Sequence, residues 1–184
     1  MLNIRKRFMK KRIVFLGDSL THAGRWEEFF PNVDIFNYGI PGEISIEILS
    51  RLDDVLQKQP DIIFVMMGIN DLGSGINSEE ILSHYNQLID MVKRNSKVKL
   101  IVQSLLPVNF ELFPITIFNA EDILRSNELL QSLCKKEEII FVDLYTSFST
   151  DSDELLKNYT YDGLHLNDSG YCVWKNRLLM ENLL

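Results

Sequence analysis

Short apolar runs alternate with segments of helical periodicity along this chain. Five runs rich in Val, Ile and Phe predict β-strands at residues 12–16, 34–37, 61–67, 99–104 and 139–143. Near-continuous runs of this kind are typical of strands that are covered on both faces, as in a parallel sheet. The pattern therefore favours a buried parallel sheet over an antiparallel sheet with one solvated face.

Helical segments lie between these strands. Apolar residues that recur every three or four positions predict helices at residues 44–57, 81–94, 120–135 and 168–183. Pro60 prevents continuation of the first helix, and Asn77 and Glu80 form an N-terminal cap for the second. The residues expected to face the core are Ile44, Ile48, Leu52 and Val55 in the first helix, Ile81, Tyr85, Leu88 and Val92 in the second, and Trp174, Leu178 and Leu179 in the last.

This alternation predicts a three-layer, doubly wound, flavodoxin-like α/β fold. Its five-stranded parallel sheet carries helices on both faces, because parallel strands need crossover connections that lie on the sheet. We expect one domain over residues 12–184, preceded by a basic N-terminal tail over residues 1–11. In such folds ligands bind beyond the carboxyl ends of the strands, so polar residues at those positions are the first candidates for function.

Composition narrows the range of partners. The net charge of the 184 residues is −7, which argues against a nucleic-acid-binding protein, since phosphate contacts need a basic face. No apolar run approaches the roughly 18 residues that span a bilayer, and only residues 13–16 follow the basic tail, too few for a secretion signal. We expect a cytoplasmic protein without stable membrane insertion, with Cys134 and Cys172 as buried reduced thiols.

Three loops at the carboxyl ends of predicted strands carry candidate chemistry. Ser19 follows the first strand, Gly42 the second and Asn70 the third, so the three residues are expected to share one rim of the sheet. A serine hydroxyl needs an imidazole within hydrogen-bond reach to act as a nucleophile, and the imidazole needs a partner that fixes its tautomer. Asp162 and His165, separated by one short turn, can supply both groups.

The candidate residues lie in four short sequence motifs, which together are more specific than any one of them. They read Gly-Asp-Ser-Leu-Thr at 17–21, Asn-Tyr-Gly-Ile-Pro-Gly-Glu at 37–43, Gly-Ile-Asn-Asp at 68–71 and Asp-Gly-Leu-His at 162–165. In order and spacing the chain resembles small members of the SGNH, or GDSL, hydrolase family, which contains lysophospholipase-like and platelet-activating-factor-acetylhydrolase-like esterases. One departure is Glu43, where the family more often carries Asp.

The resemblance implies a role for each of these residues. Ser19 is expected to be the nucleophile, His165 the general base and Asp162 the acid that orients it. The backbone N–H groups of Ser19 and Gly42 and the side-chain amide of Asn70 are expected to form the oxyanion hole, which meets the negative charge that develops on the ester oxygen. No metal or organic cofactor is expected; the three histidines lack a second ligand at helical spacing.

The predicted function is that of a serine esterase that cleaves a carboxylic ester through an acyl-enzyme. The expected partner is a small ester with a short acyl group, such as acetyl on a sugar or a small lipid, and a homo-oligomer is an open alternative. The same residues would also support acyl transfer to another hydroxyl. A flavodoxin-like binding module without chemistry is a third hypothesis, but it leaves Asn70 and His165 without a role, and the first loop lacks the glycines and lysine of a phosphate cradle.

The remaining polar residues are expected to have structural roles. We predict that Asp18 orders the turn before Ser19, that His22 is a partly exposed loop residue and that His84 lies on the solvated face of its helix. The segment 105–118 is too apolar for a plain surface loop. It is expected to form a wall of the substrate pocket, with core or oligomer packing as alternatives.

Overall fold

A computed structural model describes residues 10–94 and 97–183 of the chain. The sheet consists of β1 (Arg12–Gly17), β2 (Asp34–Gly39), β3 (Ile62–Met66), β4 (Lys99–Gln103) and β5 (Ile140–Val142). All strand pairs are parallel and the order is β2-β1-β3-β4-β5, which confirms the predicted doubly wound sheet. Most of the predicted basic tail, residues 1–9, lies outside the described residues.

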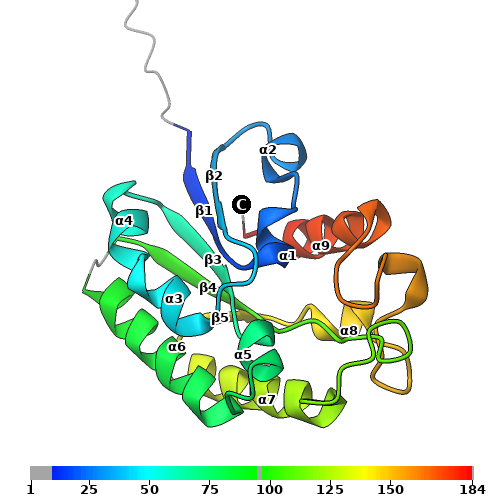
Figure 1. The fold of residues 1–184 in the computed structure, drawn as a ribbon. Helices are drawn as coiled ribbons and strands as arrows, with labels where there is room; N and C mark the ends of the chain where they lie inside the picture. Colours follow the sequence, from blue (N-terminus) through cyan, green and yellow to red (C-terminus); the bar gives the residue numbers. More distant parts are fainter. Residues whose placement is uncertain (1–9, 95–96, 184) are drawn as a thin grey trace, which may run out of the picture.

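Helices cover both faces of the sheet. Figure 1 shows α3 (Ser45–Ser50), α4 (Leu52–Gln57), α6 (Ser78–Lys93) and α7 (Ala120–Lys136) on one face and α1 (Ser19–His22) and α9 (Asp168–Met180) on the other. The shorter elements are α2 (Trp26–Phe29), α5 (Ile69–Gly73), α8 (Tyr145–Phe148) and a 3-10 turn (Lys157–Tyr159). Within the described ranges, no helix has the length and apolar content that crossing a membrane requires.

Two helix predictions need correction. The segment predicted as one helix over 44–57 is broken at Arg51, whose backbone leaves the helical region (φ −103, ψ 10) while its side chain binds Glu43 and the carbonyl of Gly17. The last helix ends at Met180, because Asn182 adopts a left-handed conformation (φ 51) that stops it. Leu179, predicted to face the core, is 46% exposed.

An aromatic cluster joins β1 to the helices on the α9 face. The Phe15 ring stacks on Trp26 with 4.2 Å between centroids, and Trp26 contacts the edge of Trp174 at 5.0 Å. All three side chains are almost fully buried, and each such burial contributes roughly 1.5–3 kcal/mol or more to stability. The carboxyl end of β1, where Ser19 begins α1, is thereby held between α2 and α9.

Candidate active site

Ser19 is the first residue of α1 and is separated from the end of β1 by the single residue Asp18. The side chain of Asp18 caps this helix, because its Oδ1 accepts the backbone N–H of Leu20 at 3.0 Å. The predicted role of Asp18 in ordering the turn is therefore confirmed. Ser19 is half-buried, and its Oγ lies 3.1 Å from Nε2 of His165, which comes from the other end of the chain.

A short turn between Thr160 and Leu166 carries His165. Asp162 accepts the backbone N–H groups of Leu164 and His165 through Oδ1, at 2.9 and 2.7 Å. Thr160 Oγ1 donates to the carbonyl of His165 at 2.7 Å and accepts the N–H of Gly163 at 2.9 Å. These side chains close the turn and fix the backbone of His165.

The imidazole bridges Asp162 and Ser19. His165 Nδ1 lies 2.7 Å from Asp162 Oδ2, while Nε2 faces the Ser19 hydroxyl. Partial burial acts to raise the pKa of Asp162, but the hydrogen bonds from His165 outweigh it and hold that pKa below its usual value. An ionised Asp162 places the ring hydrogen on Nδ1, which leaves the Nε2 lone pair free to accept the Ser19 hydroxyl hydrogen.

Gly42 and Asn70 lie on the loops that follow β2 and β3. Gly42 has a φ of +81, a conformation that favours glycine, and a Cβ built on it would meet no atom within 4 Å. Asn70, in α5, donates from Nδ2 to the carbonyl of Glu43 at 2.9 Å. An amide nitrogen carries two hydrogens, so this bond fixes the Asn70 side chain and leaves one donor for a ligand.

Asp18 is a buried acid beside this arrangement. Only 1% of its surface is exposed, and burial raises the pKa of its carboxyl to about 6, although the hydrogen bond from Leu20 acts in the opposite direction. Its second oxygen, Oδ2, has no hydrogen-bond partner among the described residues. Next to Ser19 the protein thus holds a buried carboxyl whose pKa is raised well above its usual value.

A second Ser–His–Asp arrangement, which sequence reasoning missed, lies behind the loop that carries Gly42. Ser45 Oγ donates to Asp71 Oδ1 and lies 2.6 Å from His84 Nδ1. The prediction that His84 is solvated is wrong, since only 8% of its surface is exposed. A signal was present in the sequence, because residue 84 stands three positions after Ile81 and four before Leu88, both on the buried stripe of α6.

His22 and the cysteines complete the sequence candidates. His22 is exposed, as expected, but it ends α1 instead of lying in a loop, and its Nδ1 is 3.0 Å from the carbonyl of Gly39. Cys134 is a buried free thiol, as predicted, whereas Cys172 is exposed. In the described part of the chain, no group of three or more His, Cys, Asp or Glu side chains is placed to hold a metal ion.

The apolar segment 105–118 divides between core and surface. Leu105, Val108 and Phe118 are buried, as the core-packing alternative predicts. The N–H of Asn109 donates to the carbonyl of Gly163 at 2.8 Å, which joins the segment to the turn that carries His165. Leu112, in contrast, is 43% exposed next to this turn.

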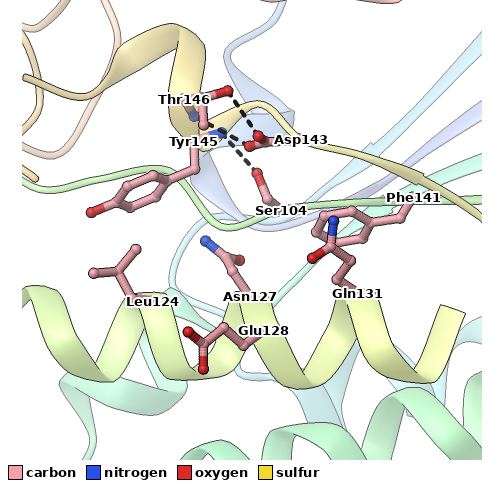
Figure 2. Close-up of a pocket in the computed structure, with 9 residues that line it drawn as sticks. All are labelled: Ser104, Leu124, Asn127, Glu128, Gln131, Phe141, Asp143, Tyr145 and Thr146. Atoms are coloured by element: carbon pink, nitrogen blue, oxygen red, sulfur yellow. Dashed lines mark hydrogen bonds between the residues drawn. The ribbon is translucent and has the colours of Figure 1, made fainter. Parts of the chain in front are cut away.

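A separate cavity of about 140 Å³ lies between α7 and the segment around α8 (Figure 2). Several of its polar side chains are hydrogen-bonded within the protein. Ser104 Oγ accepts two backbone N–H groups, Asp143 accepts the backbone N–H and the hydroxyl of Thr146, and the Asn127 amide binds both backbone groups of Leu105. None of the predicted site residues lines this cavity, so it is not the candidate active site.

Comparison with known proteins finds a matching family, similar sequences and similar solved structures. Residues 15–173 match the GDSL-like Lipase/Acylhydrolase family. N-acylneuraminate cytidylyltransferase of Streptococcus agalactiae serotype V is 32% identical over 152 residues, 83% of this chain but 34% of that protein. This chain thus spans about a third of the length of those relatives.

Platelet-activating factor acetylhydrolase IB subunit alpha2 of Rattus norvegicus is 27% identical over 182 residues, 93% of this chain and 77% of that protein. A solved GDSL-like lipase from Bacteroides thetaiotaomicron is 26% identical with a TM-score of 0.84, over 95% of this chain and 89% of that one.

Proposed function

Because this chain belongs to the GDSL-like lipase/acylhydrolase family of carboxylic ester hydrolases, we propose that it is a serine esterase with Ser19 as its nucleophile. One observation carries the proposal: the series of contacts from Ser19 Oγ through the His165 ring to Asp162, with distances of 3.1 and 2.7 Å. A serine, an imidazole and a carboxylate in this order are what activation of a hydroxyl requires.

Acylation begins when Ser19 Oγ attacks the ester carbonyl and His165 Nε2 takes the hydroxyl proton. The carbonyl π electrons move to the oxygen, which becomes negative. When they return, the bond to the alcohol oxygen breaks and His165 gives its proton to that oxygen. The alcohol leaves, and the acyl group remains on Ser19.

Deacylation repeats these steps with water. His165 removes a proton from water as the water oxygen attacks the acyl carbonyl, and it returns the proton to Ser19 Oγ as the acid leaves. Asp162 stays ionised throughout and stabilises the imidazolium that forms in each half-reaction. No redox step or cofactor enters this scheme.

Three donors are proposed to stabilise the negative oxygen. The Ser19 and Gly42 backbone N–H groups and the second hydrogen of the Asn70 amide take this role. Ser19 is the first residue of α1, where backbone N–H groups have no partner within the helix. The open space beside Gly42 allows close approach of a substrate to its backbone. Fixed donors of this kind are worth far more in the transition state than mobile water.

Hydrolysis is favoured over acyl transfer by the exposure of the base. The side chains of His165 and Asp162 are 42% and 47% exposed, so bulk water reaches Nε2 once the alcohol has left. An acyltransferase would need to keep water away from this position. The contacts that join Ser19, His165 and Asp162 also argue against a binding module, which has no need of a Ser–His–Asp series.

For the substrate we propose a small ester with a short acyl group. The acetylhydrolase relatives are named for platelet-activating factor and an acetyl group, and the cytidylyltransferase relatives for N-acylneuraminate. Acetyl esters of a small lipid or of a sugar are therefore the substrates that we propose. Exposed apolar side chains flank the proposed site on three loops: Ile40 two residues before Gly42, Leu112 beside the turn of His165, and Tyr161 next to Asp162. They offer contacts for the apolar part of such an ester.

The test compares wild-type protein with Ser19→Ala on p-nitrophenyl esters from acetyl to decanoyl, followed by acetylated sugars. We expect hydrolysis that is fastest for the short esters and falls by about 10⁶-fold in the variant, because nucleophile and base act as one unit. A fluorophosphonate should label the wild-type protein at Ser19. Hydrolysis that persists in Ser19→Ala above a few per cent would place the nucleophile elsewhere.

A further inference from the structure

The loop over residues 40–44 carries Gly42 and is held at both ends. At its start, the N–H of Ile40 donates to the carbonyl of Gly17 at 3.0 Å. Near its end, Asn70 binds the carbonyl of Glu43. The carboxylate of Glu43 in turn pairs with Arg51 at 2.7 Å, and both of these side chains are largely buried. The position of Gly42 relative to Asn70 thus depends on how the start of α3 is fixed.

Ser45, the first residue of α3, makes this attachment. Its backbone N–H donates to Asp71 Oδ2 at 2.8 Å, and its hydroxyl donates to Asp71 Oδ1. Asp71 directly follows Asn70 in α5, so the two donor-bearing loops are joined through one carboxylate. Ser45 and Asp71 have no exposed surface. The hydrogen-bonding groups of Ser45 and Asp71 are therefore shielded from bulk water and depend on partners within the protein.

His84 completes the cluster from α6. The Ser45 hydroxyl has one hydrogen, which it gives to Asp71, so its oxygen must accept from His84, whose Nδ1 therefore carries a hydrogen. The contact is 2.6 Å long and buried. A buried hydroxyl that lost this donor would leave an acceptor unpaired, and such losses cost more than an exposed hydrogen bond contributes.

We propose that His84 is a positioning residue for the active site, acting through Ser45 and Asp71 to hold Gly42 and Asn70 at a fixed separation. The inference rests on the proposed function, in which those two residues stabilise the oxyanion. The network works as a clamp between three helices: α6 supplies His84, α3 supplies Ser45 and α5 supplies Asp71.

The cluster is not a second active site, although it has the composition of a catalytic triad. In a triad the imidazole stands between serine and carboxylate, and the serine is open to substrate. Here the serine stands in the middle, bonded to both partners, and is completely buried. A substrate has no access to Ser45, and its hydroxyl hydrogen is already committed to Asp71.

The experiment compares His84→Leu with His84→Asn in p-nitrophenyl acetate hydrolysis. The Asn amide can place an N–H where Nδ1 stands, whereas Leu fills the space without a donor. We expect His84→Leu to lower kcat by about 10–100-fold with KM changed less than about twofold, because displaced oxyanion donors act on the transition state. His84→Asn should recover most of kcat.

Val92→Ala is the matched control for general destabilisation. Val92 is a buried residue of the same helix, two turns further on and outside the cluster. It should lower the melting temperature and leave kcat unchanged. If His84→Leu does not fold, Ser45→Ala carries the same expectation for kcat. The proposal is overturned if the variant tested keeps a wild-type kcat. It is also overturned if Val92→Ala or His84→Asn loses as much kcat as that variant.

Backbone hydrogen exchange separates this proposal from the proposed esterase activity. The N–H of Ser45, held by Asp71, should exchange at least about tenfold faster in His84→Leu than in the wild type, which corresponds to weakening of local protection by about 1.4 kcal/mol. This readout needs no substrate. If the wild-type protein hydrolyses no ester, the proposed function fails while faster exchange still supports the clamp; unchanged exchange overturns the clamp by itself.

Discussion

Asp162 binds His165 at two places with one carboxylate. Oδ2 lies 2.7 Å from the ring Nδ1, and Oδ1 accepts the backbone N–H of the same residue at 2.7 Å. The side chain therefore has two separable tasks, to set the imidazole tautomer and to shape the turn. Substitutions that keep one task and remove the other distinguish a catalytic from a structural contribution.

Asp162→Asn should keep the turn and disturb the tautomer. The amide oxygen can still accept the backbone N–H groups, while the amide nitrogen, a donor, faces Nδ1 and favours the ring form with its hydrogen on Nε2. That form cannot accept the Ser19 proton. We expect kcat to fall by up to about 10⁴-fold, by analogy with serine proteases, with little change in melting temperature.

Asp162→Ala is the companion variant, since it loses both tasks and should lower the melting temperature as well as kcat. Steady-state rates and thermal unfolding of the two variants give the comparison. A near-wild-type rate in Asp162→Asn would mean that the ring keeps its orientation without the carboxylate, and Asp162 would then be a turn residue only.

Asn70→Ala should lower kcat by about 10²–10³-fold, because it removes a donor that acts on the transition-state oxyanion. It also frees the Glu43 carbonyl, so Asn70→Asp is a useful second variant: it keeps the shape but presents only acceptors to both groups. We expect Asn70→Asp to be at least as slow as Asn70→Ala. Asn86→Ala, an exposed residue of α6, should hydrolyse p-nitrophenyl acetate like the wild type. Wild-type turnover in Asn70→Ala would remove this residue from the oxyanion hole.

Gly42→Ala and Gly163→Ala separate backbone strain from steric collision. Both glycines have positive φ, +81 and +93, and a Cβ there costs roughly 1–2 kcal/mol. At Gly42 the added Cβ meets nothing, but at Gly163 it lies 2.6 Å from the backbone oxygen of Asn109 and 2.8 Å from the nitrogen of Phe113. Urea unfolding should show the larger loss in Gly163→Ala. Equal losses would contradict the description of the two loops.

Local patterns of apolar residues were sufficient to predict most of the fold. The five apolar runs became the five strands of the sheet, and the carboxyl ends of three of them placed Ser19, Gly42 and Asn70. These features depend on short segments and on a rule of parallel sheets. The contact between Ser19 and His165 joins residues 146 positions apart. The sequence indicated it through the need of a serine nucleophile for an imidazole and through the family resemblance, not through a local pattern.

Long-range contacts explain two of the wrong predictions, the unbroken helix over 44–57 and the solvated His84. The break at Arg51 depends on Gly17, 34 residues away, and the burial of His84 on Ser45, 39 residues away. Helical periodicity places residue 84 on the buried stripe of α6, but it does not show which partner satisfies a buried imidazole. The polar partner here lies on another helix, so no local pattern contained it.

The final prediction concerns Asp18 and pH. Burial raises the pKa of this carboxyl from the usual 3.8 to about 6. Between these values the folded protein keeps a proton that the unfolded chain has lost, so the folded state binds more protons and Asp18 lowers stability as pH rises through this window. The loss approaches its full value, about 3 kcal/mol, near pH 7, about one pH unit above the pKa in the folded protein.

Asp18→Asn should remove this dependence, because an amide does not titrate and its oxygen can still cap Leu20. The free energy of unfolding of the variant minus that of the wild type should therefore increase by up to about 3 kcal/mol from pH 4 to pH 7, and then stay constant. Urea unfolding of both proteins at pH 4, 5, 6, 7 and 8 measures the difference, in which the titration of all other groups largely cancels. A difference that is the same at pH 4 and pH 7 would show that Asp18 ionises as readily in the folded protein as in the unfolded chain, against its burial in the turn before Ser19.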